Sequence, residues 1–447
     1  MTTISKKGHT DREVRIGLIG FGTIGTGVVK LLQRNQAQIR ARLGARLTLA
    51  RIADIDLTTD RGVKVNRKIL TNNAESLIDD PKIDIVIELM GGYETARRFA
   101  LRAIGNRKGL VTANKALLAV HGTEIFRAAE KARVDIGYEA SVGGGIPIIR
   151  TLKEGLAGDR NRAIYGIVNG TSNYILSTMT QDGGEFAAVL KEAQQQGLAE
   201  ADPTYDVDGI DAAHKLTLLL QLAFGTAARF KDIPVEGIRH ISQLDINFAQ
   251  EFGYVIKLLA IAKQDGDQIE ARVHPTMVPR QHLLADVNGA YNAIFVQGDA
   301  LGSSMYFGLG AGMMPTATAV VADLMEVARN ILGDSRGRVA PLGYPLSQQR
   351  KVPIKPMEDL DTEYYLRFMV VDRPGVLAKI SGILGAHDIS IASVIQRERV
   401  HGASVPIVIR THRACERNLR RALRQIDRLS AVRAKSALIR IENSLGQ

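Results

Sequence analysis

The sequence has a single cysteine and no long apolar run, and each scarcity excludes a class of protein. One thiol, that of Cys415, cannot build a disulfide framework or a cysteine-rich zinc site, and it fits a reducing compartment. No apolar stretch approaches the roughly 18 residues that a membrane span needs. The apolar segment 14–29 ends in no small-residue cleavage site, so we do not interpret it as a signal peptide. We therefore expect a cytoplasmic protein with no membrane partner.

Aromatic residues are absent from the most basic part of the chain. The net charge is +11, and segment 397–440 holds twelve Lys or Arg against three acids, Glu398, Glu416 and Asp427. This segment contains no Phe, Tyr or Trp, so it lacks the stacking platforms that single-strand binders use for bases. We expect a solvated basic face there and no nucleic-acid partner.

The composition, 45% hydrophobic and 23% charged, is that of a globular protein, and 447 residues are enough for several domains. The first 140 residues alternate short apolar strands with helical patterns, which favours a parallel sheet covered on both faces. The expected strands are Val14–Gly20, Leu47–Ala53, Ile83–Leu89, Leu110–Thr112 and Val134–Gly137. The N-terminal part is therefore predicted to be an α/β domain of the Rossmann type.

Two further domains are predicted beyond it. Up to about Gly333 longer helices mix with strands such as Ile164–Val168, which indicates an α+β domain, and a stretch with four prolines then forms a linker or wrapping arm. The last part has a ferredoxin-like βαββαβ pattern, with strands Tyr364–Val371, Ile389–Gln396, Ala403–Arg410 and Ala434–Ile441 and helices Val376–Ala386 and Cys415–Asp427. The predicted domains are 12–140, 141–333 and 358–443, with 334–357 as the linker.

A glycine motif after the first strand predicts a dinucleotide site. It is Gly20-Phe21-Gly22-Thr23-Ile24-Gly25, a GxGxxG between a strand and a helix. Gly20 allows the tight turn, Gly22 lets the backbone approach a pyrophosphate, and Gly25 permits close packing of the helix on the strand. The pyrophosphate would sit at the helix N-terminus, where free N–H groups favour an anion.

The cofactor preference stays open at this point. Asp54 or Asp56, after the second strand, is the candidate for binding the ribose hydroxyls, and a carboxylate there favours NAD. The nearby Arg51, Arg61 and Lys64 could instead serve the 2′-phosphate of NADP. Two glycine-rich stretches, 143–145 and 308–312, fit either tight packing turns or a backbone that approaches a ligand.

Two lysines are candidates for acid–base chemistry. Lys115 follows the strand Leu110–Thr112, at the edge where open α/β sheets bind ligands, although a surface lysine at a helix start is an equal interpretation. Lys215 opens a helix that is apolar nearly all round as far as Phe224, and Asp211 lies one turn before it on the same face. An exposed ion pair is the alternative, but a lysine on a buried helix favours a cleft. A second cation nearby would lower the pKa of that lysine toward the working pH.

Several segments, taken in order, carry a resemblance to a known family. They are GFGTIG at 20–25, Thr112–Lys115, Tyr138–Pro147, Asn169–Tyr174, Glu200–Lys215, Gly310–Gly312 and Thr316-Ala317. They closely resemble homoserine dehydrogenase of the longer bacterial type. The resemblance implies reversible reduction of L-aspartate 4-semialdehyde to L-homoserine with NAD or NADP, on the route to threonine, methionine and isoleucine. It also implies that domain 141–333 is catalytic and pairs subunits as a homodimer or homotetramer.

The resemblance implies roles for individual residues. Lys215 would protonate the nascent alkoxide, with Lys115 beside the reacting oxygen and Asp211 positioning Lys215. The substrate contacts would be Glu200 and Asp206 to the amino group, with Thr171 and Lys115 lining the pocket. The cofactor contacts would be Gly20, Phe21, Gly22, Thr23, Ile24, Gly25, Asp54, Lys115 and Gly312. A monovalent cation, Na⁺ or K⁺, would bind the carbonyl or carboxylate of Glu139 and the carbonyls of Val142, Gly144 and Ile146, since hard cations take oxygen ligands.

The C-terminal domain independently resembles an ACT domain, a βαββαβ unit that binds amino acids at a subunit interface. The matching segments are Asp372–Leu377 and His387–Ile391. A turn at Pro374-Gly375 leaves N–H groups at a helix N-terminus free for a carboxylate. We expect feedback inhibition by L-threonine bound near Gly375 and Asp388. The alternative is a degenerate unit used only for assembly, with the basic helix 417–428 as its solvated outer face.

Two other functions compete with this one. A Rossmann-type sensor would bind a nucleotide and, through the basic tail, a nucleic acid, but it has no need of the Lys115/Lys215 pair and the acid cluster. A related enzyme, or a fragment of a bifunctional one, would use the same scaffold for a different small carbonyl substrate.

Overall fold

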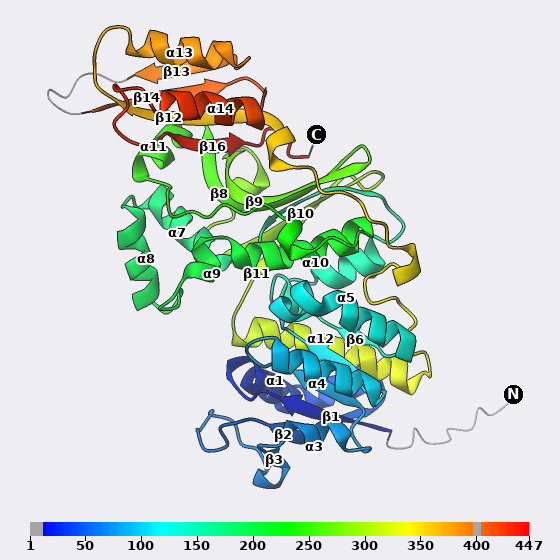
Figure 1. Ribbon diagram of the computed structural model, residues 1–447. Helices are drawn as coiled ribbons and strands as arrows, with labels where there is room; N and C mark the ends of the chain where they lie inside the picture. The colour runs from blue at the N-terminus through cyan, green and yellow to red at the C-terminus, as the bar shows by residue number, and fades with distance from the viewer. Residues whose placement is uncertain (1–11, 397–403, 447) are drawn as a thin grey trace, which may run out of the picture. The chain divides into compact units, whose positions relative to one another are not determined.

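The computed structural model describes residues 12–396 and 404–446 and divides into two compact units (Figure 1). Unit 1 holds the residues up to Arg160 with Thr217–Phe230 and Tyr306–Lys351, and unit 2 holds Asn161–Leu216, Lys231–Met305 and the residues from Val352 on. The domain boundaries expected from the sequence stay predictions. No helix in the described part of the chain is both long and apolar enough to cross a membrane.

Unit 1 contains the predicted parallel sheet, with six strands in the order β3-β2-β1-β4-β5-β6. The strands are β1 (Glu13–Ile19), β2 (Arg46–Ala53), β3 (Leu70–Thr71), β4 (Ile85–Glu88), β5 (Gly109–Thr112) and β6 (Ile136–Gly137). Five of them lie within one or two residues of the expected strands, because each coincides with an apolar run. The sixth, β3, is only two residues long and was missed.

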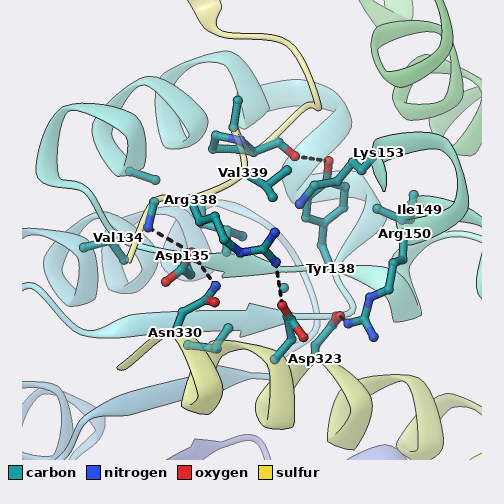
Figure 2. Close-up of a pocket in the computed structure, with 18 of the residues that line it drawn as sticks. Val134, Asp135, Tyr138, Ile149, Arg150, Lys153, Asp323, Asn330, Arg338 and Val339 are labelled. Carbon is teal, nitrogen blue, oxygen red and sulfur yellow. Dashed lines mark hydrogen bonds and ion pairs between the residues drawn. The ribbon is translucent and has the colours of Figure 1, made fainter. Parts of the chain in front are cut away.

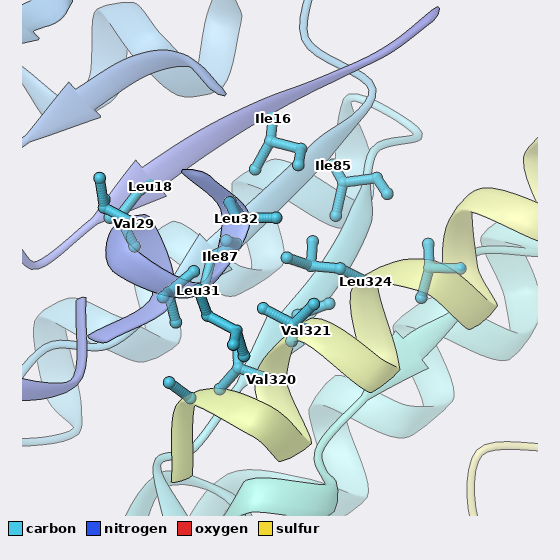
Figure 3. Close-up of a cluster of buried hydrophobic side chains, with 14 of the residues drawn as sticks. Ile16, Leu18, Val29, Leu31, Leu32, Ile85, Ile87, Val320, Val321 and Leu324 are labelled. Carbon is cyan, nitrogen blue, oxygen red and sulfur yellow. The ribbon is translucent and has the colours of Figure 1, made fainter. Parts of the chain in front are cut away.

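The helices of unit 1 come from distant parts of the chain. They are α1 (Thr23–Arg34), α2 (Gln36–Leu43), α3 (Ala74–Asp79), α4 (Glu94–Gly105), α5 (Lys115–Ala132), α6 (Ile148–Arg150) and α12 (Met313–Leu332), with short helical turns η1 (Arg67–Ile69), η2 (Glu139–Ser141), η3 (Thr151–Gly155), η4 (Phe230–Asp232, which begins in unit 1) and η6 (Leu346–Gln348). Figure 3 shows Leu31 and Leu32 of α1 and Val320 and Leu324 of α12 in one core with Ile16 of β1. Helix α12, from a late part of the chain, thus packs on the parallel sheet near the N-terminus. The sequence pattern did not predict this contact.

Unit 2 is built on a mixed sheet in the order β11-β10-β7-β8-β9-β16-β12-β14-β13. Its first strands are β7 (Asn161–Ile167), β8 (Tyr254–Asp265), β9 (Gln268–Pro279), β10 (Tyr291–Gly298) and β11 (Ser303–Leu309, which continues into unit 1). Its helices are α7 (Gly170–Gln181), α8 (Phe186–Gln195), α9 (Thr204–Val207), α10 (Ile210–Phe224, which also continues into unit 1) and α11 (Gln243–Glu251), with η5 (Leu283–Asp286) and η7 (Met357–Asp359).

The C-terminal part of unit 2 has the predicted ferredoxin-like topology. Its elements are β12 (Asp361–Val370), α13 (Val376–Ala386), β13 (Ile391–Gln396), β14 (Val405–Thr411), the short β15 (Ala414–Cys415), α14 (Glu416–Ile426) and β16 (Ala437–Ile441). The third strand was expected to start at Ala403, which lies outside the described residues. The antiparallel strand order β13-β14-β12-β16 confirms the predicted fold, and both helices pack on it through one apolar cluster.

This domain does not have a sheet of its own. Its last strand pairs in parallel with β9, through Arg440 beside Thr276 and Ile441 beside Met277. The strands of the C-terminal domain and β7–β11 therefore form one continuous sheet, which the local sequence pattern did not predict.

The basic helix α14 is only partly solvated. Arg417, Arg421 and Arg424 are exposed, as expected. Arg420 instead donates to Glu236, 2.7 Å away, so this arginine belongs to an internal ion-pair network.

The contact between α1 and α12 leads to a stability prediction. A Cβ on Gly27 would lie 2.7 Å from Met313 Cγ and 2.8 Å from Met313 O. Gly27→Ala should therefore lower the thermal unfolding midpoint, because overpacking costs about 1–3 kcal/mol and outweighs the ~1 kcal/mol gain in helix propensity. Gly382→Ala is the matched control, since Gly382 of α13 faces open space, and it should leave the midpoint unchanged or higher. A Gly27→Ala protein as stable as the wild type would contradict this packing.

Candidate active site

A pocket of about 790 Å³ in unit 1 lies where the sequence predicts the dinucleotide. It is lined by residues that follow the strands β1, β2 and β4 and by the first residues of α3, among them Gly20, Gly22, Asp54, Leu89 and Asn73. The carboxyl edge of an open parallel sheet is the usual ligand site of such folds.

The three glycines of the motif have the geometry that their predicted roles require. Gly20 has a φ of +94°, and a Cβ there would lie 2.5 Å from Leu89 O. A Cβ on Gly25 would collide with Gly20 O, so close packing of α1 on β1 requires glycine. A Cβ on Gly22 would meet no neighbouring atom within 4 Å, and Gly22 lines the pocket, which leaves its backbone accessible to a ligand. Thr23 and Ile24 begin α1, whose first turn has no acidic residue, so an anion is favoured there.

Asp54, and not Asp56, faces this pocket. The Asp54 carboxylate accepts a hydrogen bond from Phe21 N and pairs with Arg61 at 3.6 Å, which ties the glycine loop to the second strand. The Asp56 carboxylate accepts hydrogen bonds from Thr58 and Thr59, which hold its pKa well below the usual range. Asp56 is therefore a turn residue. Of the three cations, Arg61 lies beside Asp54 and over the Phe21 ring, and Arg51 pairs with Asp80.

Lys115 begins α5, and the strand ends that lead to it are held by a buried acid. Glu88, at the end of β4, accepts hydrogen bonds from Thr112 Oγ1 at 2.6 Å and from Met90 N at 2.8 Å, and its burial raises its pKa. Asn114 N donates to Thr112 Oγ1, and the Asn114 side chain caps α5 through Leu117 N. Sequence reasoning missed Glu88, although an acid closing an apolar strand is a visible signal.

The second lysine is buried in unit 2 and fully engaged. Lys215 Nζ donates to Asp211 Oδ2 at 2.7 Å and to Val168 O, at the end of β7, at 2.5 Å. The Lys215 side chain is 9% exposed, so the alternative of a solvated surface pair is wrong. The cluster is a buried ammonium with a carboxylate one helical turn before it, as the sequence predicts.

Asn169 joins the acids of this cluster. Its side-chain nitrogen donates to Asp206 Oδ1 at 2.7 Å and to Asp211 Oδ2 at 2.9 Å, and its oxygen caps α7 by accepting from Ser172 N. Ser172 Oγ donates to Asp206 O. Asn169 was assigned no role from the sequence, yet its position between a strand and a helix is typical of ligand sites.

The other predicted substrate residues lie in the same unit. Thr171 Oγ1, in the first turn of α7, donates to Leu198 O at 2.9 Å. Glu200 is exposed on the loop before α9, and its backbone oxygen accepts from Gln194 Nε2. Both lie on segments that flank Asp206.

Glu139, the first residue of the predicted cation loop, lines a charged cavity of about 340 Å³ in unit 1. Figure 2 shows this cavity with Arg150, Lys153 and Asp323 around it. The Glu139 carboxylate accepts hydrogen bonds from Ile149 N at 2.7 Å and Arg150 N at 2.9 Å, so it caps α6. Glu139 N donates to Asp323, whose pKa burial raises to about 7. Burial also raises the pKa of Glu139 and lowers that of Lys153. The Glu139 carbonyl also accepts a hydrogen bond, from Val142 N at 3.4 Å. Because each of these oxygens has a further lone pair, both the carbonyl and the carboxylate of Glu139 stay candidate cation ligands.

The two glycine-rich stretches of unit 1 pack on each other. Gly144 has a φ of +54°, and a Cβ there would lie 2.6 Å from the Gly310 carbonyl carbon. Gly145 N donates to Leu309 O. This backbone approach favours the packing interpretation and brings the Val142–Ile146 loop beside the segment that ends in Gly312, the first residue before α12. In the described part of the chain no three His, Cys, Asp or Glu side chains form a metal cluster.

The predicted regulatory residues do not lie together in one chain. Gly375 precedes α13 with a φ of +85°, and Asp388 follows it with a φ of +59°. The eleven residues between these caps make a helix about 16 Å long. One amino acid cannot contact both positions of a single chain.

Comparisons with known proteins match the whole length of this arrangement. Family models match at residues 20–139 (homoserine dehydrogenase, NAD binding domain), 147–325 (homoserine dehydrogenase) and 364–431 (ACT domain). The homoserine dehydrogenase of Neisseria gonorrhoeae is 43% identical over 97% of this chain and 99% of its own length. That of Synechocystis is 44% identical over 96% and 99%.

Solved structures agree with the sequence matches. The crystal structure of a homoserine dehydrogenase from Thiobacillus denitrificans superposes with a TM-score of 0.90 at 46% identity, covering 96% of this chain and 98% of that one. The enzyme from S. aureus superposes with a TM-score of 0.75 at 31% identity, covering 97% and 99%.

The pocket geometry predicts which aspartate binds the cofactor. Asp54→Asn should weaken the binding of NADH or NADPH about tenfold, because it removes a charged acceptor from the pocket and from Phe21 N. Asp56→Asn is the matched control and should change the dissociation constant by less than about twofold. Titration of cofactor fluorescence with both nucleotides measures this and also gives the preference. Equal effects of the two substitutions would contradict the assignment.

Proposed function

Since the chain belongs to the homoserine dehydrogenase family, with an NAD(P)-binding domain and a C-terminal ACT domain, we propose that it interconverts L-homoserine and L-aspartate 4-semialdehyde with Lys215 as the general acid–base. The observation that carries the assignment is the buried Lys215 ammonium, held by Asp211 and the end of β7. The nicotinamide of the bound NAD or NADP supplies or accepts the hydride.

Lys215 handles the proton of this reaction. In the reducing direction a hydride reaches the aldehyde carbon, the C=O bond becomes C–O, and the oxygen gains negative charge. Lys215 Nζ donates a proton to that oxygen and stabilises the charge before the transfer is complete. Asp211, 2.7 Å from Nζ, keeps the amine oriented, and Lys115 provides a second positive charge in the proposed complex. In the oxidising direction a neutral Lys215 takes the same proton back.

The acids around Lys215 select the substrate. Asp206 and Glu200 hold the substrate ammonium group, and Thr171 lines the pocket beside them. Support comes from Asn169, whose amide group donates to both Asp206 and Asp211. The acid proposed to bind the substrate therefore lies next to the Lys215–Asp211 pair. Because a carboxylate in the pocket forms a strong hydrogen bond with an ammonium group, the site favours an amino-acid substrate over small aldehydes or alcohols that carry no such group.

We also propose a monovalent cation, Na⁺ or K⁺, bound by the carbonyl or carboxylate of Glu139 and the carbonyls of Val142, Gly144 and Ile146. An all-oxygen ligand set suits such an ion. Its role would be to fix the loop that packs against the segment before Gly312. The protein acts as a homodimer or homotetramer in the cytoplasm.

The first test is the homoserine-dependent rise in absorbance at 340 nm with NAD⁺ and with NADP⁺. Lys215→Ala should lower turnover by roughly 100-fold or more, because a general acid–base group typically contributes that much. Cofactor binding should be retained. Lys191→Ala, an exposed lysine of α8 in the same unit, serves as the control and should keep wild-type activity. Full turnover in Lys215→Ala would remove the lysine from the mechanism.

We further propose that L-threonine bound to the ACT domain inhibits the enzyme. Its carboxylate would lie on the free N–H groups at the start of α13, near Gly375, and its ammonium near Asp388. Because these positions lie at opposite ends of α13, two copies of the chain must complete each threonine site. The proposal therefore ties feedback to assembly.

Threonine should lower the rate of homoserine oxidation in the wild-type enzyme. Asp388→Asn should raise the half-inhibiting threonine concentration at least about tenfold, because a charge-assisted hydrogen bond is lost while asparagine still accepts the positive φ. Asp334→Asn is the matched control, an exposed aspartate with a φ of +52° in unit 1. A wild-type rate that does not respond to threonine would overturn the feedback proposal.

A further inference from the structure

We infer that Glu236 is a positioning residue for Asp206, the acid proposed to bind the substrate. The ACT domain holds Glu236 in place through Arg420 and Arg440. The inference rests on the proposed role of Asp206 in binding the substrate ammonium. It adds a function for the ACT domain that needs no effector: to complete the substrate site of its own chain. All residues concerned lie in unit 2.

Glu236 lies in a network of ion pairs with the ACT domain. Arg440 of β16 donates to both oxygens of Glu236, at 2.8 and 3.0 Å, and Arg420 of α14 donates to Oε1 at 2.7 Å. Although burial opposes ionisation, the hydrogen bonds and charge of Arg440 hold the pKa of Glu236 well below its usual range. Glu236 thus stays charged at any working pH.

Arg440 is a buried cation that is shared by two carboxylates. Its side chain is only 2% exposed, and it also binds Glu416 at 2.6 and 3.0 Å. The strand pairing of β16 with β9 places the backbone of Arg440 beside that of Thr276. A charge buried in this way holds its partners firmly, because leaving it unpaired is costly.

The short segment that carries Glu236 lies between β9 and the end of α9. Glu236 N donates to Val273 O of β9 at 2.8 Å, and two residues later Ile238 N donates to Val207 O at 2.8 Å. Between these bonds, a Cβ on Gly237 would lie 2.5 Å from Asp208 Cα, so the segment runs in direct backbone contact with the end of α9.

The same segment contacts α9 on either side of Asp206. Arg239 donates to Asp208 Oδ1 at 2.5 Å and to Thr204 Oγ1 at 3.2 Å, so the segment grips α9 on both sides of Asp206. The other face of Asp206 is held by Asn169 and Ser172. The helix α9 has only four residues and cannot fix the side chain of Asp206 by its own hydrogen bonds.

The test is a steady-state comparison in the full-length enzyme. Glu236→Gln should raise the KM for homoserine on the order of three- to tenfold, as expected of a network residue that touches no ligand. The KM for the cofactor and kcat should stay within about twofold, because the catalytic pair is untouched. Arg440 keeps Glu416 as a partner in this variant, so the fold is retained.

Arg420→Gln is a second variant that guards against a folding defect. The Arg420 side chain is 42% exposed, and its loss should raise the same KM in the same direction by a smaller factor. Glu358→Gln is the matched control, because Glu358 pairs with Arg417 of the same helix but contacts nothing near α9, and its kinetic constants should equal those of the wild type.

Two results would overturn the inference. One is an unchanged KM for homoserine in both Glu236→Gln and Arg420→Gln. The other is a parallel loss of kcat and of both KM values, which would indicate a general structural role. Asp206→Asn separates the inference from the proposed function: if that variant leaves the KM for homoserine unchanged, the role of Asp206 itself fails.

Discussion

The ammonium group of Lys215 is buried, and a buried charge must find all its partners inside the protein. Three elements meet to provide them: the end of β7 gives the Val168 carbonyl, α10 gives Asp211, and the cap of α7 gives Asn169, which orients Asp211. Removing one partner of such a pair typically costs about 3–5 kcal/mol. The position of the Lys215 amine therefore depends on the end of β7, the start of α10 and the cap of α7 lying together.

The same principle explains why the C-terminal domain shares a sheet with the catalytic strands. Its strand β16 brings the buried Arg440 to Glu236 and Glu416, and the same strand pairs with β9. A second buried network repeats the pattern beside it, where Glu442 accepts from Lys263 and Arg272 of the catalytic strands. Both networks and the backbone ladder cross between the two parts of unit 2, and the first of them is the route by which we propose that the ACT domain positions Asp206.

The sequence predicted most of the local structure, because apolar runs and cap residues are local signals. Five of the six strands of the parallel sheet, the helix Val376–Ala386 and the lysine–aspartate turn were placed correctly. Long-range features were not accessible: Arg440 lies in a basic segment and reads as a surface residue until its pairing with Glu236 is seen. The Glu139 carboxylate fitted a cation ligand by type, yet a helix cap engages it.

The central claim is that the Lys215 amine itself transfers the proton, and chemical rescue tests it most directly. Small primary amines added to Lys215→Ala should restore part of the turnover, and the restored rate should vary systematically with the pKa of the amine, as Brønsted behaviour requires. Lys191→Ala should show no response to the same amines. Absence of rescue in a variant that still binds cofactor and homoserine, or rescue that ignores the pKa of the amine, would contradict the account.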